Sequence, residues 1–512
     1  MRRLICLLAA ALLASGASAQ PNVYRSIPPS ERDDARPPAP EPTLPPPQNL
    51  PPNLPDLGES SQVELTPQLE RRIGESIMRE IRRDPDYVDD PEIKDYVQQL
   101  GYRLVAASPG NRQDFDFFVV RDRTVNAFAM PGGFIGVHTG LIVTAQSESE
   151  FASVLAHELA HVLQRHMARQ YDAQAKVSKL SIVAFAAALL LGRGNPQAAA
   201  AIGSAASAAP AAVFLSYSRD FEREADRVGF QILDASGYDT AGMPAFFERL
   251  QTATRLYDNN APVYLRTHPL TTERIADMQN RAATAHYRQR ADSREFQLVR
   301  AKLRATDGRP EEAVAFFRTA LAERRFADET AIRYGYAAAL ARAKDFKLAD
   351  AEIGAVRKTA QPHPMFETLA AQIKVGLGDA AAAEAILVAA GQRYPDFVAI
   401  KYDRATVLQT LGRNKEAAAL LGELAKDRPN DARVYQMLAK SYAALGARVQ
   451  QHRALAEAYY LQGSLPAAIE QLQFAQGAGD GDFYTLSAVD ARLRELKRMQ
   501  VEAMKERKQG GL

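Results

Sequence analysis

The sequence predicts a mainly α-helical protein with a small β-sheet, in which a globular domain is followed by an α-solenoid of paired helices. Three observations support this prediction. At 512 residues the chain is too long for one hydrophobic core. Apolar residues recur at helical spacing over most of it, interrupted by short aromatic and β-branched runs between residues 115 and 143. From about residue 296 the sequence repeats with a fixed period.

The first 19 residues have the organisation of a secretory signal peptide. Arg2 and Arg3 precede an apolar run from Leu4 to Leu13, and an Ala-Ser-Ala sequence at 17–19 supplies the cleavage pattern. The apolar run is shorter than the roughly 20 residues that span a bilayer. We therefore expect the leader to be removed and the mature protein to be exported.

Cys6 is the only cysteine, and it lies in this leader. The mature chain then has no thiol, which excludes cysteine nucleophiles, disulfides and cysteine metal ligands and leaves His, Asp and Glu. The leader also holds two of the 63 basic residues, so that basic and acidic residues balance in the mature chain. Such a balance gives no electrostatic footprint for nucleic acid or anionic lipid.

Composition changes along the chain predict its organisation. The stretch after the leader is dense in proline and has few large apolar side chains, so it cannot bury enough surface to order itself. The predicted segments are a signal peptide at 1–19, a disordered linker at 20–60, the first globular domain at 61–290 and the helical repeat domain at 296–495.

Helix start signals open the globular domain. Thr66 and Asp90 are each followed by proline at the first helical position, so a helix is expected after both. Ser147 and Glu150 have the spacing of a capping box, and the helix after them is expected to run to about Arg169.

The structure of two other regions is predicted from their composition. The run from Phe115 to Val120 is expected to be a strand, and a strand pair is expected between Asn126 and Val143 around a Pro-Gly-Gly turn. Residues 180–215 are rich in alanine and are read as a pair of small-residue helices packed on the core. A mobile lid and a surface that touches the membrane are the alternatives for 180–215.

The C-terminal part has a period of 34 residues. Gly378, Gly412 and Gly446 stand 34 residues apart, as do Pro395 and Pro429. Alanines recur five residues beyond the first two glycines, and a looser copy begins near residue 308. Glycine turns, alanines at close helix crossings and a terminal proline in such a period resemble tetratricopeptide repeats. Repeats of this kind supply a concave surface for protein recognition.

The sequence His157-Glu158-Leu159-Ala160-His161 carries the candidate chemistry. Two histidines four residues apart project from one helix face with a rise of about 6 Å, so both imidazoles can bind one tetrahedral ion. Glu158 is offset around the helix and can reach a water on that metal without binding the metal itself. We predict that Glu158 is the general base.

A hydrolytic zinc site needs a third protein ligand and one open position. Glu222 lies 65 residues after His157, and Asp226 shares its face of another expected helix. We predict that Glu222 is the third ligand and that Asp226 accepts from the free ring nitrogen of a ligating histidine. The alternative is a charged surface helix whose acids pair with the arginines at 219, 223 and 227.

These motifs together resemble a known family. An HExxH sequence, a later Glu-x-x-Ala-Asp helix and the upstream Asn-Ala-Phe-Ala-Met-Pro-Gly-Gly at 126–133 look like the CAAX prenyl endopeptidase and HtpX family of peptidases. The exported branch with C-terminal repeats, the β-barrel assembly-enhancing proteases of Gram-negative bacteria, is closer still, over roughly residues 65–500. This resemblance implies one Zn²⁺ per chain, a gluzincin-type catalytic domain at 61–290, a periplasmic location and quality control of outer-membrane proteins.

The resemblance also implies two further parts of the site. An edge strand beside the metal, able to pair with an extended substrate backbone, would be formed by Asn126, Ala127, Phe128 and Ala129. His268, in a Thr-His-Pro-Leu sequence, would either stabilise the oxyanion or occupy the fourth zinc position and hold the enzyme inactive.

The other histidines receive no catalytic role. His166 falls five residues after His161, on a different helix face, and is assigned to structure. The remaining ones have no partner pattern: His138, His286, His363 and His452.

The predicted function is a zinc-dependent endopeptidase that degrades misfolded or stalled outer-membrane proteins and assists their assembly. Its predicted partners are unfolded or misassembled proteins and, through the repeats, the outer-membrane assembly machinery. The rival is a chaperone-like adaptor whose repeats bind that machinery while proteolysis is idle or conditional. A protein that contacts the membrane surface peripherally through 180–215 is a second rival.

Overall fold

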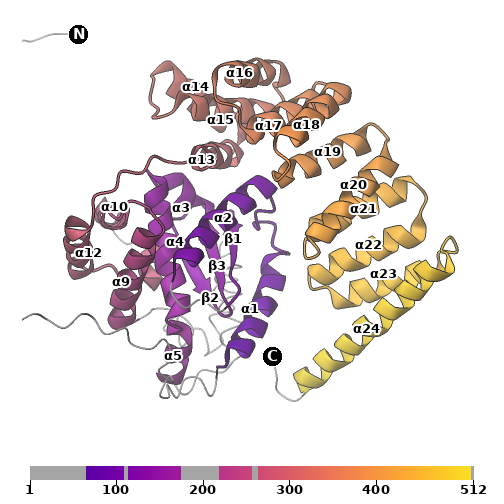
Figure 1. Ribbon diagram of the computed structural model, residues 1–512, viewed down its shortest axis with the longest axis horizontal. Helices are drawn as coiled ribbons and strands as arrows, with labels where there is room; N and C mark the ends of the chain where they lie inside the picture. The colour runs from indigo at the N-terminus through magenta and orange to yellow at the C-terminus, as the bar shows by residue number, and fades with distance from the viewer. Residues whose placement is uncertain (1–64, 109–112, 174–217, 257–262, 509–512) are drawn as a thin grey trace, which may run out of the picture. The chain divides into compact units, whose positions relative to one another are not determined.

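The computed structural model describes residues 65–108, 113–173, 218–256 and 263–508. The predicted leader at 1–19, the linker at 20–60 and the alanine-rich segment at 180–215 lie outside these ranges. Within them the protein is mainly helical with one small sheet (Figure 1), so the predicted fold class is confirmed. Among the helices of these ranges, none combines the length and hydropathy needed to cross a bilayer.

The first two helices begin where the sequence predicts. Thr66 caps α1 (Pro67–Ile81) by accepting the N–H of Leu69 at 3.3 Å. Asp90 caps α2 (Pro91–Ala107) by accepting two N–H groups of its first turn at 3.0 and 3.2 Å. Proline at the first helical position removes one N–H that would otherwise need a partner.

The sheet has three strands in the order β1–β3–β2. Strand β1 (Asp116–Val120) pairs in parallel with β3 (Phe134–His138), and β2 (Ala127–Met130) pairs antiparallel with β3. Strands β2 and β3 both lie between Asn126 and Val143, so the predicted strand pair is confirmed. The short helix α3 (Thr139–Thr144) follows β3 directly and buries Leu141 and Ile142.

Helix α4 (Glu148–Leu163) begins as predicted, with Ser147 accepting the N–H of Glu150 at 3.2 Å. The Glu150 carboxylate takes the N–H of Gln146 at 2.7 Å, so only half of the expected capping box forms. The predicted end near Arg169 is wrong. The helix stops at Leu163, and a separate helix α5 (His166–Ala173) follows.

Helix α9 (Arg219–Ala235) packs along α4 (Figure 1). The two backbones approach closely at Gly229, where an added Cβ would lie 3.0 Å from the backbone nitrogen of His157. In the described residues between α9 and α13, three further helices follow: α10 (Gly242–Leu256), α11 (Val263–Thr267) and α12 (Thr272–Thr284).

The C-terminal part is a succession of helix pairs in which each helix packs against its neighbours in sequence (Figure 1). Ala383 and Ala417 of the repeating pattern are fully buried. The helices are α13 (Arg294–Thr306), α14 (Pro310–Ala322), α15 (Glu329–Arg342), α16 (Phe346–Thr359), α17 (Pro364–Gly376), α18 (Ala380–Arg393), α19 (Val398–Thr410), α20 (Asn414–Asp427), α21 (Ala432–Ala444), α22 (Arg448–Leu461), α23 (Leu465–Gly477) and α24 (Phe483–Lys508).

Two glycines of one repeat give a test of these turns. Gly412 has a φ of +74° and open space around its missing Cβ, so Gly412→Ala is expected to lower the free energy of unfolding by about 1–2 kcal/mol through backbone strain alone. Gly422 lies inside α20, also with open space, so Gly422→Ala is the control and is expected to raise it by about 0.5–1 kcal/mol. Urea unfolding of both variants measures the difference, and equal signs would contradict the turn geometry.

Candidate metal centre

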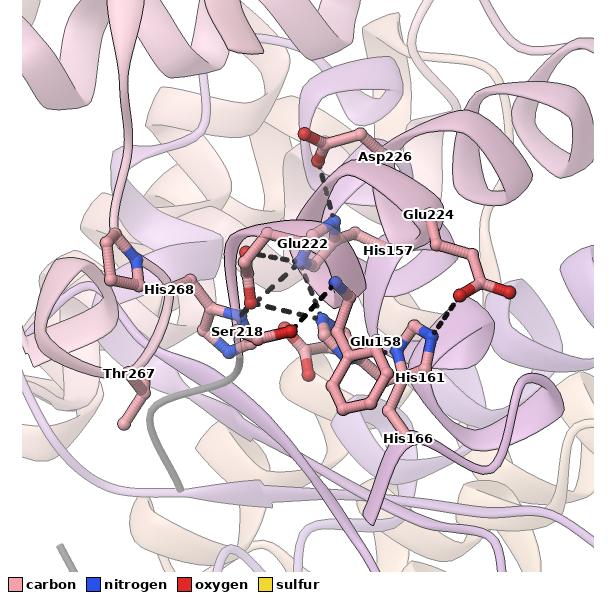
Figure 2. A network of polar contacts seen from close by, with 12 residues as sticks. His157, Glu158, His161, His166, Ser218, Glu222, Glu224, Asp226, Thr267 and His268 are labelled. Carbon is pink, nitrogen blue, oxygen red and sulfur yellow. Dashed lines mark hydrogen bonds and ion pairs between the residues drawn. The ribbon is translucent and has the colours of Figure 1, made fainter. Parts of the chain in front are cut away.

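Helices α4 and α9 bring the predicted ligands together (Figure 2). The Nε2 atoms of His157 and His161 lie 3.0 Å apart. The Glu222 carboxylate lies beside both, with Oε2 3.5 Å from His157 Nε2 and Oε1 3.5 Å from His161 Nε2. All three side chains are at most 1% exposed. Two separate helices thus aim their donor atoms at one buried point.

These separations fit a tetrahedral zinc ion. Ligand atoms about 2.0–2.1 Å from zinc are roughly 3.3 Å from each other at tetrahedral angles. The observed separations of 3.0 and 3.5 Å bracket that value. Two imidazole nitrogens and one carboxylate oxygen are also a donor set of hydrolytic zinc sites. The residues present therefore fit the predicted metal.

His268 lies at the fourth corner of the same cluster. Its Nδ1 atom is 2.9 Å from Glu222 Oε1 and 3.4 Å from His157 Nε2. Its Nε2 atom is 3.5 Å from Glu158 Oε1, and its ring stacks on Tyr264 with centroids 4.6 Å apart. One donor atom from each of four residues lies within 4.8 Å of the others: His157, His161, Glu222 and His268.

Asp226 lies where the spacing predicts, with Oδ1 3.0 Å from His157 Nδ1. Arg274 binds Asp226 through two N–H groups at 2.6 and 2.8 Å and also reaches Glu222 Oε2 at 2.8 Å. The guanidinium therefore holds both acids of α9 in place. The competing surface-helix interpretation requires these acids to pair with neighbouring arginines, but Arg223 pairs with Asp220 and Glu273 instead.

Charged neighbours and burial shift the pKa values of this cluster in different directions: burial and the neighbouring His157 lower the pKa of His161 well below its usual value. Burial alone would lower the pKa of His157, but its contacts with Asp226 and Glu222 outweigh burial and raise that pKa to about 9. Burial likewise opposes ionisation of Glu222, yet the surrounding histidines hold its pKa well below the usual value. A site that stabilises carboxylates and added positive charge is suited to a divalent cation.

Glu158 is fully buried next to this cluster, with Oε1 3.5 Å from His268 Nε2. Burial raises the pKa of Glu158, while His268, His157 and the backbone N–H of Ala129 act in the opposite direction. The carboxylate is thus close to the metal-facing atoms and free to take a proton.

Strand β2 presents its outer edge to Glu158. Within the described ranges β2 pairs only with β3, and the bond from His138 N–H to Asn126 C=O at 3.0 Å fixes the hydrogen-bonding register. Because antiparallel pairs alternate, the backbone groups of Ala127 and Ala129 point away from β3. The predicted edge strand therefore lies beside the cluster, although Asn126 precedes the strand and Met130 belongs to it.

Sequence reasoning missed three residues around the ligands. Tyr264 stacks on His268, and no pattern in the sequence indicates this contact. His166 and Glu224 form a polar chain behind His161 (Figure 2). The assignment of His166 to a distant helix face assumed one uninterrupted helix, and the break before α5 invalidates that assumption.

Comparison with known proteins finds relatives over most of the chain. Residues 91–282 match Peptidase family M48, and residues 375–441 match the tetratricopeptide repeat. The beta-barrel assembly-enhancing protease of Escherichia coli (strain K12) is 31% identical over 455 residues, 87% of this chain and 92% of the relative. That of Yersinia pestis is 32% identical over 448 residues, 87% of this chain and 92% of the relative. A Vibrio cholerae serotype O1 protein reaches 33% over 452 residues, with coverages of 88% and 93%.

Arg274 gives a test of the buried charge arrangement. In metal-free protein, Arg274→Met is expected to lower the free energy of unfolding by about 3–5 kcal/mol, because Glu222 and Asp226 then remain buried without their guanidinium. Arg223→Met is the control: its side chain is 37% exposed and its ion pairs are screened by solvent, so a much smaller change is expected. Urea unfolding after chelator treatment measures both. Equal losses would contradict the assignment of Arg274.

Proposed function

We propose that this protein degrades misfolded or stalled outer-membrane β-barrel proteins in the periplasm. The chain belongs to the family of the beta-barrel assembly-enhancing proteases and is a zinc metalloendopeptidase. The observation that carries the proposal is the convergence of His157, His161 and Glu222 on one buried point. The relatives' name supports the substrate class, and the leader-like first 19 residues support the location.

His157, His161 and Glu222 hold one zinc ion in this proposal. Bound zinc polarises the scissile carbonyl and lowers the pKa of a bound water towards about 7. The Glu158 carboxylate accepts the proton of the attacking water and delivers it to the leaving amide nitrogen. Its burial supports this role, because a carboxyl with a raised pKa both takes and returns a proton readily. Asp226 accepts from His157 Nδ1 and so keeps the opposite nitrogen available to the metal.

The outer edge of β2 orients the substrate. An unfolded segment can add as a further strand by pairing with the outward backbone groups of Ala127 and Ala129. Backbone pairing selects extended chains rather than particular side chains, which suits cleavage of misfolded proteins. Since the Ala129 N–H acts on Glu158, a strand paired there passes next to the base.

His268 is the fourth ligand in the resting enzyme. Its Nδ1 atom stands at ligand-to-ligand distances from Glu222 and His157, which supports this role over oxyanion stabilisation. Proteolysis is then conditional on displacement of His268. This feature also gives weight to the second candidate function, an adaptor that engages assembly substrates through its repeats and cleaves only when they stall.

The two domains have separate roles in this proposal. Residues 61–290 form the catalytic domain, and residues 296–495 form the repeat domain that binds substrates and the assembly machinery. The match of residues 375–441 to the tetratricopeptide repeat supports the protein-binding role.

Glu158→Gln tests the base. The variant is expected to bind one equivalent of zinc and to cleave an unfolded polypeptide about 10²–10⁴-fold more slowly than the parent. Zinc content is measured by metal analysis and cleavage by gel assay, with a chelator control in which zinc restores parent activity. Parent-like cleavage by the variant would contradict the assignment.

The same variant tests the substrate class, because it can retain what it does not cleave. Glu158→Gln expressed with its leader in a Gram-negative host is expected to co-purify with unfolded outer-membrane β-barrel proteins. Recovery of only unrelated periplasmic proteins would contradict the proposed substrates while leaving the peptidase chemistry intact.

His268→Ala separates the two roles of His268. Removal of a fourth ligand frees the metal-facing position, so cleavage of an unfolded polypeptide is expected to rise several-fold. Loss of an oxyanion stabiliser would instead lower kcat by about 10²–10³-fold. Initial rates at matched zinc content distinguish these results, and a fall in kcat would overturn the resting-ligand role.

A further inference from the structure

A chain of polar contacts continues from His161 away from the metal-facing side (Figure 2). The Nδ1 atoms of His161 and His166 lie 2.9 Å apart. His166 Nε2 then lies 3.2 Å from Glu224 Oε2, and Arg169 reaches the same oxygen at 2.9 Å. His166 is fully buried, whereas Glu224 is about one-third exposed.

Hydrogen-bond chemistry fixes the direction of this chain. His161 Nε2 lies among the ligand atoms, so it carries no proton when it binds a metal, and Nδ1 is then the protonated nitrogen. His166 Nδ1 must therefore accept from His161, which leaves His166 Nε2 as the donor to the Glu224 carboxylate. One tautomer of each ring satisfies these contacts.

The backbone turn that places His166 is unfavourable for its sequence. Arg165 has a φ of +50°, a left-handed conformation that a residue with a long side chain rarely adopts. Its guanidinium is held by the carbonyl of Leu65 at 2.6 Å and by Glu70 at 3.4 Å. This turn lies two residues after the end of α4 at Leu163 and returns the ring of His166 to His161. Strain retained next to a metal ligand indicates a functional constraint.

Helix α9 holds the His166 ring from a second face. Phe221 stacks on it with centroids 4.6 Å apart and planes inclined by 15°. Phe221 and Glu224 are three residues apart and hence neighbours on one side of α9. The other side carries Glu222 and Asp226, which face the metal centre and His157. Helix α9 thus orients both ligand histidines. One face acts on His157 through Asp226, and the other acts on His161 through His166.

We propose that His166 is a positioning residue of the metal centre, which fixes the tautomer and ring orientation of His161 and is itself oriented by Glu224. The inference deepens the proposed function and rests on His161 being a zinc ligand. The two ligand histidines are supported unequally: His157 Nδ1 lies 3.0 Å from a carboxylate oxygen of Asp226, whereas His161 Nδ1 lies 2.9 Å from a ring nitrogen of His166. Substitution of His166 removes the acceptor that orients the His161 ring.

Two substitutions at one position separate orientation from packing. His166→Phe keeps an aromatic ring against Phe221 but has no acceptor. His166→Asn loses the ring but places a carbonyl oxygen near the position of Nδ1. Zinc affinity, measured by competition with a chromophoric chelator, is expected to fall about 10–100-fold in His166→Phe and to be largely retained in His166→Asn. The d–d absorption of the Co²⁺-loaded protein is expected to change in His166→Phe alone.

His363→Phe is the matched control, because His363 is also buried and also pairs with a glutamate, Glu295, at 3.0 Å, but lies in the repeats. It is expected to keep the parent zinc affinity. A parent-like affinity of His166→Phe would overturn the positioning role, as would equal losses in the Phe and Asn variants. A parent protein that binds no zinc would instead contradict the proposed metal site itself.

Discussion

The close approach of α9 to α4 is the constraint on which the site depends. A Cβ at Gly229 would lie 3.0–3.1 Å from backbone atoms of Ala156 and His157, so a side chain there would require the two helices to shift by a few tenths of an ångström. At this distance Glu222 and Asp226 lie 3.5 and 3.0 Å from the two ring nitrogens of His157. A larger residue would push the helices apart, and the metal centre requires donor atoms within a few tenths of an ångström of their positions.

This approach carries a large electrostatic cost that the structure offsets locally. Burying ionised Glu222 and Asp226 is unfavourable unless cations face them. Arg274 supplies one cation in every state of the protein, and a bound zinc ion supplies more. The chemistry and the stability of the catalytic domain are therefore linked, because the groups that bind the metal are the groups that most need it.

Sequence reasoning succeeded where one helix carries the whole signal. The spacing of HExxH and of Glu222 with Asp226 converts directly into shared helix faces, and N-cap chemistry located α1, α2 and α4. It failed at the end of α4, since the turn at Arg165 depends on Leu65, which is 100 residues earlier in the chain. No local pattern encodes such a contact.

The proposed roles of β2 and His268 meet at Glu158. The Ala129 N–H and the His268 ring both act on this carboxylate, the ring from 3.5 Å. A substrate strand paired along β2 brings its scissile carbonyl to the same place, and two groups cannot occupy it together. Productive binding must then displace His268, so that substrate itself opens the site. A protease with this arrangement cleaves chains that remain at the edge strand long enough to compete with the histidine, and folding proteins that leave quickly are spared.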